Sequence, residues 1–122
     1  MIQIKLNMRG VSASRPRVTK YGTFNAKKYD NYKKLLQAKI RGFKPLPNVP
    51  LRVELFFGFI PSKSAKKNKY PVPKYDVDNL AKGVLDACNG ILFEDDVLVE
   101  ELEVIKRYAD VDCIFITIEE IE

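Results

Sequence analysis

The chain has 122 residues, a net charge of +5 and no histidine, and it is long enough for one domain with one core, spanning residues 1–122. Without histidine, Ser-His-Asp and Cys-His nucleophilic sites are excluded, so catalysis would depend on carboxylates, lysine, tyrosine or a metal. Two cysteines, no N-terminal secretion signal and no apolar run of about 18 residues predict a cytoplasmic protein without a membrane anchor.

The charge is divided unevenly along the chain. Residues 1–74 carry 18 Lys and Arg against 2 Asp and Glu, whereas residues 75–122 carry 3 against 14, so the two parts have net charges of +16 and −11. A basic part attracts polyanions and an acidic part can hold cations. The alternative is that the two parts mainly neutralise each other, but this does not explain why the acids concentrate between residues 76 and 103.

In chain order, the first half predicts a strand, a loop, a helix and a second strand. Apolar and polar residues alternate over 1–8, which is typical of a half-buried strand, and the basic stretch 9–23 contains glycine and proline and indicates a loop. Residues 27–41 carry apolar side chains at helical spacing. Three prolines then precede a Phe- and Val-rich strand over 51–60.

The second half predicts a helix followed by two strands. A lysine-rich loop without hydrophobic periodicity covers 61–73, and the helix covers 79–89. Two strands follow over 97–108 and 111–118, joined by a short turn. The order β-α-β-α-β-β predicts an α+β fold, with helices packed on one mixed β-sheet.

A first group of carboxylates lies just before the second predicted helix. If the chain from Asp76 to Asp78 is extended, both carboxylates point to the same side, which costs free energy unless a cation lies between them. Ligation by oxygen alone suits Mg²⁺ or Mn²⁺. At about 100° per residue, Asp78, Lys82 and Asp86 form one stripe of the helix, so Lys82 could contact a phosphate near Asp78.

A second group, Asp95 and Asp96, precedes the next predicted strand. Gly90 permits the chain to reverse after the helix, so this pair could return to the end that carries Asp76 and Asp78. The four aspartates would then form one metal site.

Each of these features also has a purely structural explanation. Asp78 is a suitable N-cap for the helix, and an Asp-Asp pair before a strand is often a turn. Lys82 and Asp86 would form an ordinary exposed ion pair one helical turn apart. Each structural explanation is preferable for its own feature, whereas the combination of acids, lysine and a basic remainder favours a metal site.

Several strings of residues resemble the signature of the RusA family of Holliday junction resolvases. In the acidic part these strings are Asp76-Val77-Asp78-Asn79-Leu80-Ala81-Lys82, Leu85-Asp86-Ala87, Asn89-Gly90-Ile91 and Asp95-Asp96-Val97. Two basic segments resemble the family's loops: Arg15-Pro16-Arg17-Val18-Thr19, and Pro61-Ser62-Lys63-Ser64 with the lysines that follow. Lys63 departs from the family pattern, because many relatives carry an aromatic residue there.

The resemblance implies a RusA-like fold with a catalytic site of five residues. Its metal-binding aspartates would be Asp76, Asp78 and Asp96, with Asp95 adjacent, and its active-site lysine would be Lys82. The DNA backbone would be contacted by basic side chains: Arg15, Arg17, Lys66, Lys67, Lys69 and Lys74. A solvated basic loop is the alternative explanation for any one of these.

The resemblance also implies the reaction. The protein would be a homodimeric, Mg²⁺-dependent endodeoxyribonuclease that resolves Holliday junctions by paired symmetric nicks. Mn²⁺ would substitute for Mg²⁺, and neither a nucleotide cofactor nor a membrane is expected to take part. The setting would be the cytoplasm of a bacterial cell, with the gene carried by a chromosome or a prophage.

Two other functions remain open from the sequence. A non-catalytic nucleic-acid-binding protein would need the basic part but not Asp76 together with Asp96. A different metal nuclease would act on other branched DNA or on RNA. Cleavage of a synthetic four-way junction, with and without Mg²⁺, separates the three.

Overall fold

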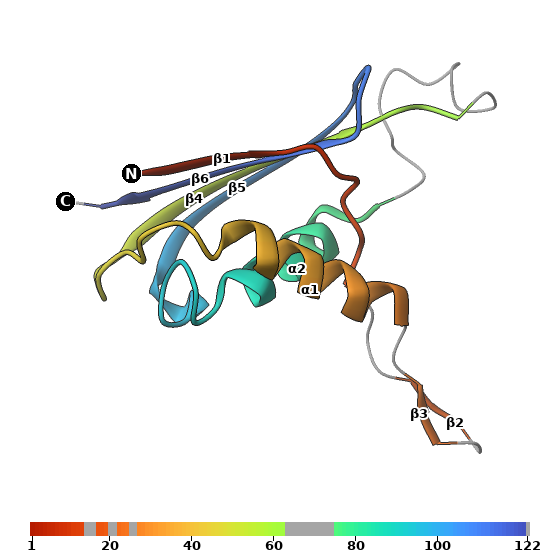
Figure 1. Cartoon of the computed structure of the whole chain (residues 1–122), viewed down its shortest axis with the longest axis horizontal. Helices are drawn as coiled ribbons and strands as arrows, with labels where there is room; N and C mark the ends of the chain where they lie inside the picture. Colours follow the sequence, from red (N-terminus) through yellow and green to blue (C-terminus); the bar gives the residue numbers. More distant parts are fainter. Residues whose placement is uncertain (14–16, 20–21, 25–26, 63–74, 122) are drawn as a thin grey trace.

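The computed structural model describes residues 1–13, 17–19, 22–24, 27–62 and 75–121. Its main sheet contains four strands: β1 (Ile2–Leu6), β4 (Leu51–Phe59), β5 (Val99–Tyr108) and β6 (Cys113–Glu120). The helices are α1 (Lys27–Ile40) and α2 (Val77–Cys88), and a short 3-10 turn, η2 (Asp96–Leu98), precedes β5. Both helices lie on the same face of the sheet (Figure 1), which confirms the predicted α+β architecture.

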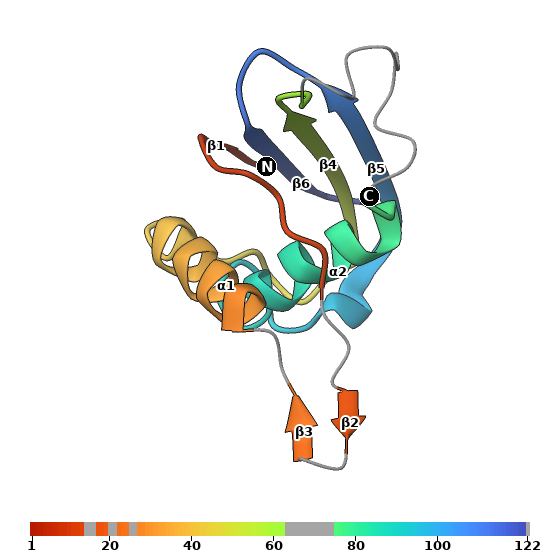
Figure 2. The same cartoon turned by 90° about the vertical axis from the view of Figure 1, so that its right-hand side faces the viewer.

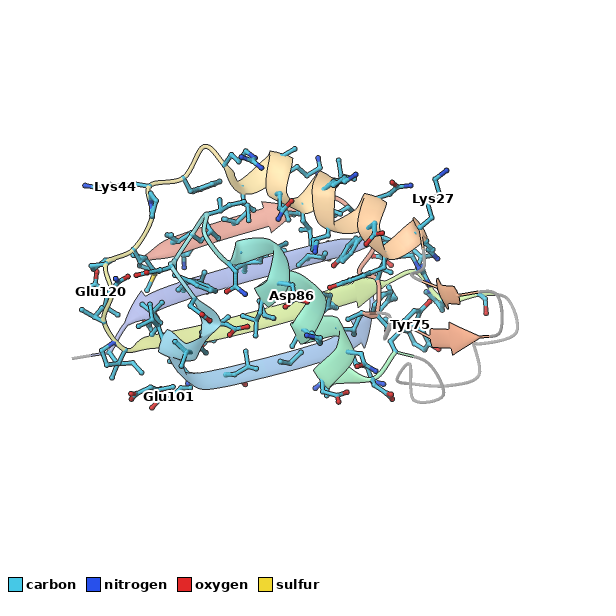
Figure 3. The ribbon with its side chains drawn as sticks, turned by 90° about the horizontal axis from the view of Figure 1, so that it is seen from below. Lys27, Lys44, Tyr75, Asp86, Glu101 and Glu120 are labelled. Carbon is cyan, nitrogen blue, oxygen red and sulfur yellow. The ribbon has the colours of Figure 1, made fainter. Side chains whose placement is uncertain are left out.

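The strands are arranged in the order β1-β6-β4-β5. β6 is antiparallel to both β1 and β4, whereas β5 is parallel to β4, so the sheet is mixed as predicted. Parallel neighbours require a crossover connection, and α2 provides it here. Figure 3 shows α2 over the β4–β5 side of the sheet and α1 over the β1 side. β5 and β6 follow each other in the sequence but are not neighbours, because β4 lies between them.

The core lies between the helices and one face of the sheet. In β4 every second residue from Leu51 to Phe59 is almost fully buried, while Arg52, Glu54 and Phe56 face the other side. β6 contributes Ile114, Ile116 and Ile118, each at most 1% exposed. This alternation explains why both strands could be recognised from the sequence.

The helices present narrow apolar faces to this core. The buried residues of α1 are Tyr29, Tyr32, Leu36 and Ile40, and those of α2 are Leu80, Ala81, Gly83, Val84, Ala87 and Cys88. Leu35, which the helical spacing grouped with the apolar face of α1, is 49% exposed. Cys88 and Cys113 are both buried and neither forms a disulfide, as expected for small apolar side chains.

One predicted loop differs from the structure. The segment 9–23 was expected to be a loop, but it contains the first strand of a short antiparallel hairpin, β2 (Arg17–Thr19) with β3 (Gly22–Phe24). This hairpin projects away from the sheet and helices (Figure 2), and each of its strands has three residues, which is too short for an alternating pattern to be recognised in the sequence. No helix in the described part of the chain is long and apolar enough to cross a membrane.

Candidate active site

The first acidic segment begins helix α2. Asp76 is the N-cap, with φ −65° and ψ 129°, and its carbonyl accepts a hydrogen bond from the Leu80 amide at 3.0 Å. Asp78 already lies in the first helical turn. The expectations that Asp76 to Asp78 is extended, and that Asp78 would be the N-cap if it were structural, are therefore wrong. A helix can begin at Val77 because Asp76 tolerates the extended N-cap conformation.

Asn79 lies next to both carboxylates at this end of the helix. Asp78 Oδ1 accepts a hydrogen bond from the Asn79 backbone amide at 2.9 Å, and Asn79 Nδ2 donates to Asp76 Oδ2 at 3.5 Å. Both aspartates are exposed to solvent. The positive end of the helix dipole favours their negative charge. The start of α2 therefore presents two carboxylates, with an amide beside them, to any cation or hydrated ion that approaches.

An open groove of about 460 Å³ runs between α2 and β5. Its walls combine apolar side chains with two carboxylates and one ammonium group, from Val77, Asp78, Ala81, Lys82, Leu85, Asp96, Leu102 and Val104. Three of the predicted catalytic residues, Asp78, Lys82 and Asp96, thus line one groove, whereas Asp76 and Asp95 are not among its lining residues.

Lys82 is 59% exposed, and its Nζ lies 3.5 Å from Asp86 Oδ2. An exposed ion pair of this kind contributes little to stability, so the ammonium can leave it for a phosphate at small cost. The same Asp86 oxygen also accepts a hydrogen bond from the Tyr29 hydroxyl at 3.0 Å. Burial, followed by this bond to Asp86, raises the pKa of Tyr29 well above its ordinary value of 10.0. Asp86 is therefore a structural partner of α1 as well as of Lys82.

The second acidic segment, Asp95 and Asp96, forms the turn before β5. Asp95 is the N-cap of η2, and its Oδ1 accepts a hydrogen bond from the Val97 backbone amide at 3.1 Å. Asp96 follows in the first turn and points into the groove. The structural explanation, a capped turn, thus accounts for Asp95. The Asp96 carboxylate lines the groove and can take part in binding there.

The two acidic segments flank the groove from opposite ends. Tyr75, just before α2, accepts a hydrogen bond from Lys106 near the end of β5, whereas η2 adjoins the start of the same strand at Val99. Lys106 is seven positions after Val99 on this extended strand, a length of about 23 Å.

Gly90, where φ is +78°, does reverse the chain. However, the expectation that this reversal returns Asp95 and Asp96 to the Asp76–Asp78 end is wrong. β4 and β5 are parallel, so α2 must carry the chain back along the sheet before β5 begins.

The donor set still fits a divalent cation of the magnesium type. No three His, Cys, Asp or Glu side chains among the described residues are grouped closely enough to hold a metal ion by themselves. Mg²⁺ does not need such a group, because it keeps several waters and is usually bound by one or two carboxylates together with substrate phosphates. Exposed aspartates that offer only oxygen ligands match this requirement and exclude a thiolate or imidazole site.

Most of the predicted DNA contacts lie outside the described residues. These are Arg15, Lys66, Lys67, Lys69 and Lys74. Arg17 begins β2, and only its backbone is described. Their contact with DNA stays a prediction.

Sequence reasoning missed a group of residues around Tyr75, made up of Arg9, Phe59, Lys106 and Asp112. The Arg9 guanidinium contacts the Tyr75 hydroxyl and Asp112, and Lys106 donates to the Tyr75 carbonyl. These residues come from separate segments of the chain, and no local pattern joins them.

Comparison with known proteins gives two matches. The sequence model of the family described as "Endodeoxyribonuclease RusA" matches residues 7–119. A protein of Bacillus subtilis (strain 168) named "Uncharacterized protein YqaN" is 39% identical over 59 residues, which cover 48% of this chain and 42% of that relative. The match thus spans less than half of the relative's length. The family match, by contrast, includes both acidic segments and almost every element of the fold, and the chain therefore belongs to the RusA endodeoxyribonuclease family.

Proposed function

We propose that this protein is a Mg²⁺-dependent endodeoxyribonuclease that resolves Holliday junctions by paired symmetric nicks. One observation carries the proposal: Asp78, Lys82 and Asp96 line a single open groove in a chain that matches the RusA family over residues 7–119. Carboxylates and an ammonium group in one groove are the side chains that a metal-assisted phosphodiester hydrolysis needs.

Asp76 and Asp78 would hold Mg²⁺ at the start of α2, and Asp96, with Asp95 beside it, would supply carboxylate oxygens at the other end of the groove. Mn²⁺ would be accepted in place of Mg²⁺, because it prefers the same oxygen ligands. A bound ion of this type lowers the pKa of a coordinated water and stabilises the charge on a phosphate.

Lys82 would act on the DNA itself. Its side chain is exposed and its ion pair with Asp86 is easily exchanged, so the ammonium can contact the phosphate at the cleavage position. There it would orient the phosphate and stabilise the negative charge that develops during cleavage. Asp86 would return Lys82 to its resting position when no DNA is present.

The basic part of the chain would hold the DNA backbone. Phosphate contacts fix the position and orientation of a duplex without reading its sequence. This role falls to Arg15, Arg17, Lys66, Lys67, Lys69 and Lys74. The net charge of +16 on residues 1–74 supports it, since such a charge attracts branched DNA by releasing counterions.

Two symmetric nicks in one junction require two active sites. A homodimer with twofold symmetry supplies them with one groove in each subunit, and this is the commonest symmetry of small assemblies. We therefore expect a dimer in solution, which sedimentation equilibrium would detect as twice the mass of the chain.

The test compares wild type with Asp78→Asn on a synthetic four-way junction. We expect wild type to cut with Mg²⁺ or Mn²⁺ and not with a chelator, and Asp78→Asn to lose at least about a hundredfold in the single-turnover rate while it still binds the junction. Glu120→Gln, which removes one exposed carboxylate from β6, is the matched control and should cut at the wild-type rate.

Each other result assigns a different function. Equal cleavage by Asp78→Asn and wild type would contradict the metal site. Equal cutting of a linear duplex, a flap or RNA would leave a metal nuclease that is not a resolvase. Junction binding without cleavage under any metal would leave a nucleic-acid-binding protein.

A further inference from the structure

Tyr75, immediately before the two carboxylates at the start of α2, has an unusual backbone. Its φ is +67°, and among the described residues it is the one non-glycine residue with a positive φ. A bulky side chain rarely adopts this left-handed conformation, because its Cβ crowds the following carbonyl. Such a conformation persists where surrounding contacts hold it.

Three contacts hold Tyr75 in place. Its ring stacks on Phe59, with centroids 4.1 Å apart and planes within 3° of parallel. Its hydroxyl contacts the Arg9 guanidinium, which also lies over both rings. Its carbonyl accepts a hydrogen bond from Lys106 Nζ at 2.8 Å. Figure 3 shows Tyr75 near the end of the sheet at which β4 ends.

Two of these partners, Phe59 and Lys106, belong to strands of the main sheet. Phe59 is fully buried at the end of β4, and Lys106 is paired with Phe57 across the parallel β4–β5 register. Arg9 is itself fixed by Asp112, whose Oδ1 lies 3.1 Å from the guanidinium and also accepts the Ile60 amide at 2.9 Å. The contacts therefore tie the start of α2 to the sheet.

We propose that Lys106 is a positioning residue for Asp76 and Asp78, acting through the Tyr75 carbonyl. The inference deepens the proposed function and rests on it. The Tyr75 carbonyl and the Asp76 amide belong to one planar peptide group, so the ammonium that holds the carbonyl also fixes the orientation in which the chain enters Asp76. Without this bond the peptide plane can rotate toward an ordinary conformation and carry both carboxylates with it.

Small displacements matter at such a site. Groups that bind a metal or position a phosphate must be held within about 0.5 Å of their working geometry by the residues behind them. Asp76 and Asp78 are exposed, and they have little packing of their own to hold them. Lys106 on β5 supplies this restraint through its hydrogen bond to the Tyr75 carbonyl.

The test compares Lys106→Met, which keeps the aliphatic stem but loses the donor, with Lys106→Arg, which keeps a donor. Mn²⁺ binding to the DNA-free protein is measured by the electron paramagnetic resonance of the free ion. We expect Lys106→Met to raise the dissociation constant about tenfold and Lys106→Arg to restore most of the affinity. The control is Lys5→Met, which also removes one lysine charge but on the exposed face of β1. It should bind Mn²⁺ with the wild-type dissociation constant.

A second readout does not involve metal. The Leu80 amide, which donates to the Asp76 carbonyl, should exchange its hydrogen about tenfold faster in Lys106→Met, while amides in the middle of α1 keep their wild-type rates. If Lys106→Met fails to fold, Tyr75→Gly provides the test, because it removes the ring and hydroxyl anchors and should weaken Mn²⁺ binding in the same way. In a folded double variant, the losses of Mn²⁺ affinity from the two substitutions should not add up, because both substitutions release the same segment, the start of α2.

The outcomes separate the inference from the proposed function. Wild-type Mn²⁺ affinity and Leu80 exchange in Lys106→Met, or additive effects with Tyr75→Gly, would overturn the positioning role. Faster exchange with unchanged Mn²⁺ affinity would also overturn it, by showing a purely structural contact. If wild type itself neither binds Mn²⁺ nor cuts a junction, the proposed function fails, and the exchange rates still show whether Lys106 holds the start of α2.

Discussion

The Tyr29 hydroxyl donates a hydrogen bond to Asp86 Oδ2 over 3.0 Å and thereby joins α1 to α2. The same carboxylate oxygen lies 3.5 Å from Lys82 Nζ. Asp86 thus serves both the helix packing and the resting position of the proposed catalytic lysine. The two contacts differ in burial, so they should differ in their contribution to stability.

Tyr29→Phe should lower the free energy of unfolding by about 1–2 kcal/mol, because a part-buried carboxylate loses a hydrogen-bond donor. Urea denaturation followed by circular dichroism measures this. Leu35→Ala, at an exposed position of the same helix, should change stability by less than about 0.5 kcal/mol. A Tyr29→Phe protein as stable as wild type would show that the hydroxyl contributes no net stability.

Lys82→Met should separate catalysis from stability. We expect the single-turnover rate of junction cleavage to fall about a hundredfold, as when one donor to a developing negative charge is removed. The free energy of unfolding should change by less than about 0.5 kcal/mol, because the Asp86 ion pair is exposed. Lys82→Arg should keep part of the rate. Unchanged cleavage by Lys82→Met would remove Lys82 from the active site.

Stability should decline at alkaline pH. Burial raises the pKa of the Cys88 thiol from its ordinary value of 9.0 to about 12, and burial likewise raises the pKa of Tyr32 from 10.0 to about 12. Both groups stay neutral in the folded protein while the unfolded chain ionises. Their contribution is therefore complete below about pH 9 and is lost as the pH rises toward 12, by about 1.4 kcal/mol per pH unit for each group.

Urea midpoints from about pH 8 to about pH 11 test this decline. Cys88→Ala should show a shallower decline than wild type, because the ionisation of the Cys88 thiol is then absent. If the urea midpoint falls equally steeply with pH in both proteins, burial of the Cys88 thiol is not a cause of the decline.

Gly10 packs against the core at a point where no side chain fits. A Cβ atom there would lie 2.6 Å from Phe57 Cδ1, and Phe57 is fully buried. Gly10→Ala should therefore destabilise the protein by about 1–3 kcal/mol. Gly42→Ala is the matched control, because its Cβ would meet nothing within 4 Å. Thermal unfolding of the two variants side by side should show a loss for Gly10→Ala alone.

Junction binding should depend steeply on salt. If the six predicted basic residues each neutralise one phosphate, a fourfold rise in salt should weaken binding about a thousandfold. Fluorescence anisotropy with Ca²⁺ in place of Mg²⁺ measures binding without cleavage. Arg15→Ala together with Lys67→Ala should reduce the slope by about 2, whereas Lys5→Ala should leave it unchanged. A flat salt dependence would exclude the basic loops as the DNA surface.

The sequence determined the elements whose evidence is local. The Phe- and Val-rich composition over 51–60 and the helical spacing over 27–41 placed β4 and α1 within one residue of their ends, because both signals depend on residues that are close along the chain. The spacing of Asp78, Lys82 and Asp86 on one stripe was also readable, since helix geometry fixes it. The acidic strings further allowed the RusA resemblance, which the family match confirms.

The way in which these elements meet depends on contacts between segments that are distant in the sequence. The neighbour of β5 is β4 rather than β6, and this parallel pairing puts Asp96 at the opposite end of the groove from Asp78. The start of α2 depends on Tyr75, whose left-handed backbone is stabilised by side chains from β4 and β5. Contacts between residues far apart in the sequence leave no periodic signal, because no local preference of the chain encodes which strand will lie beside which.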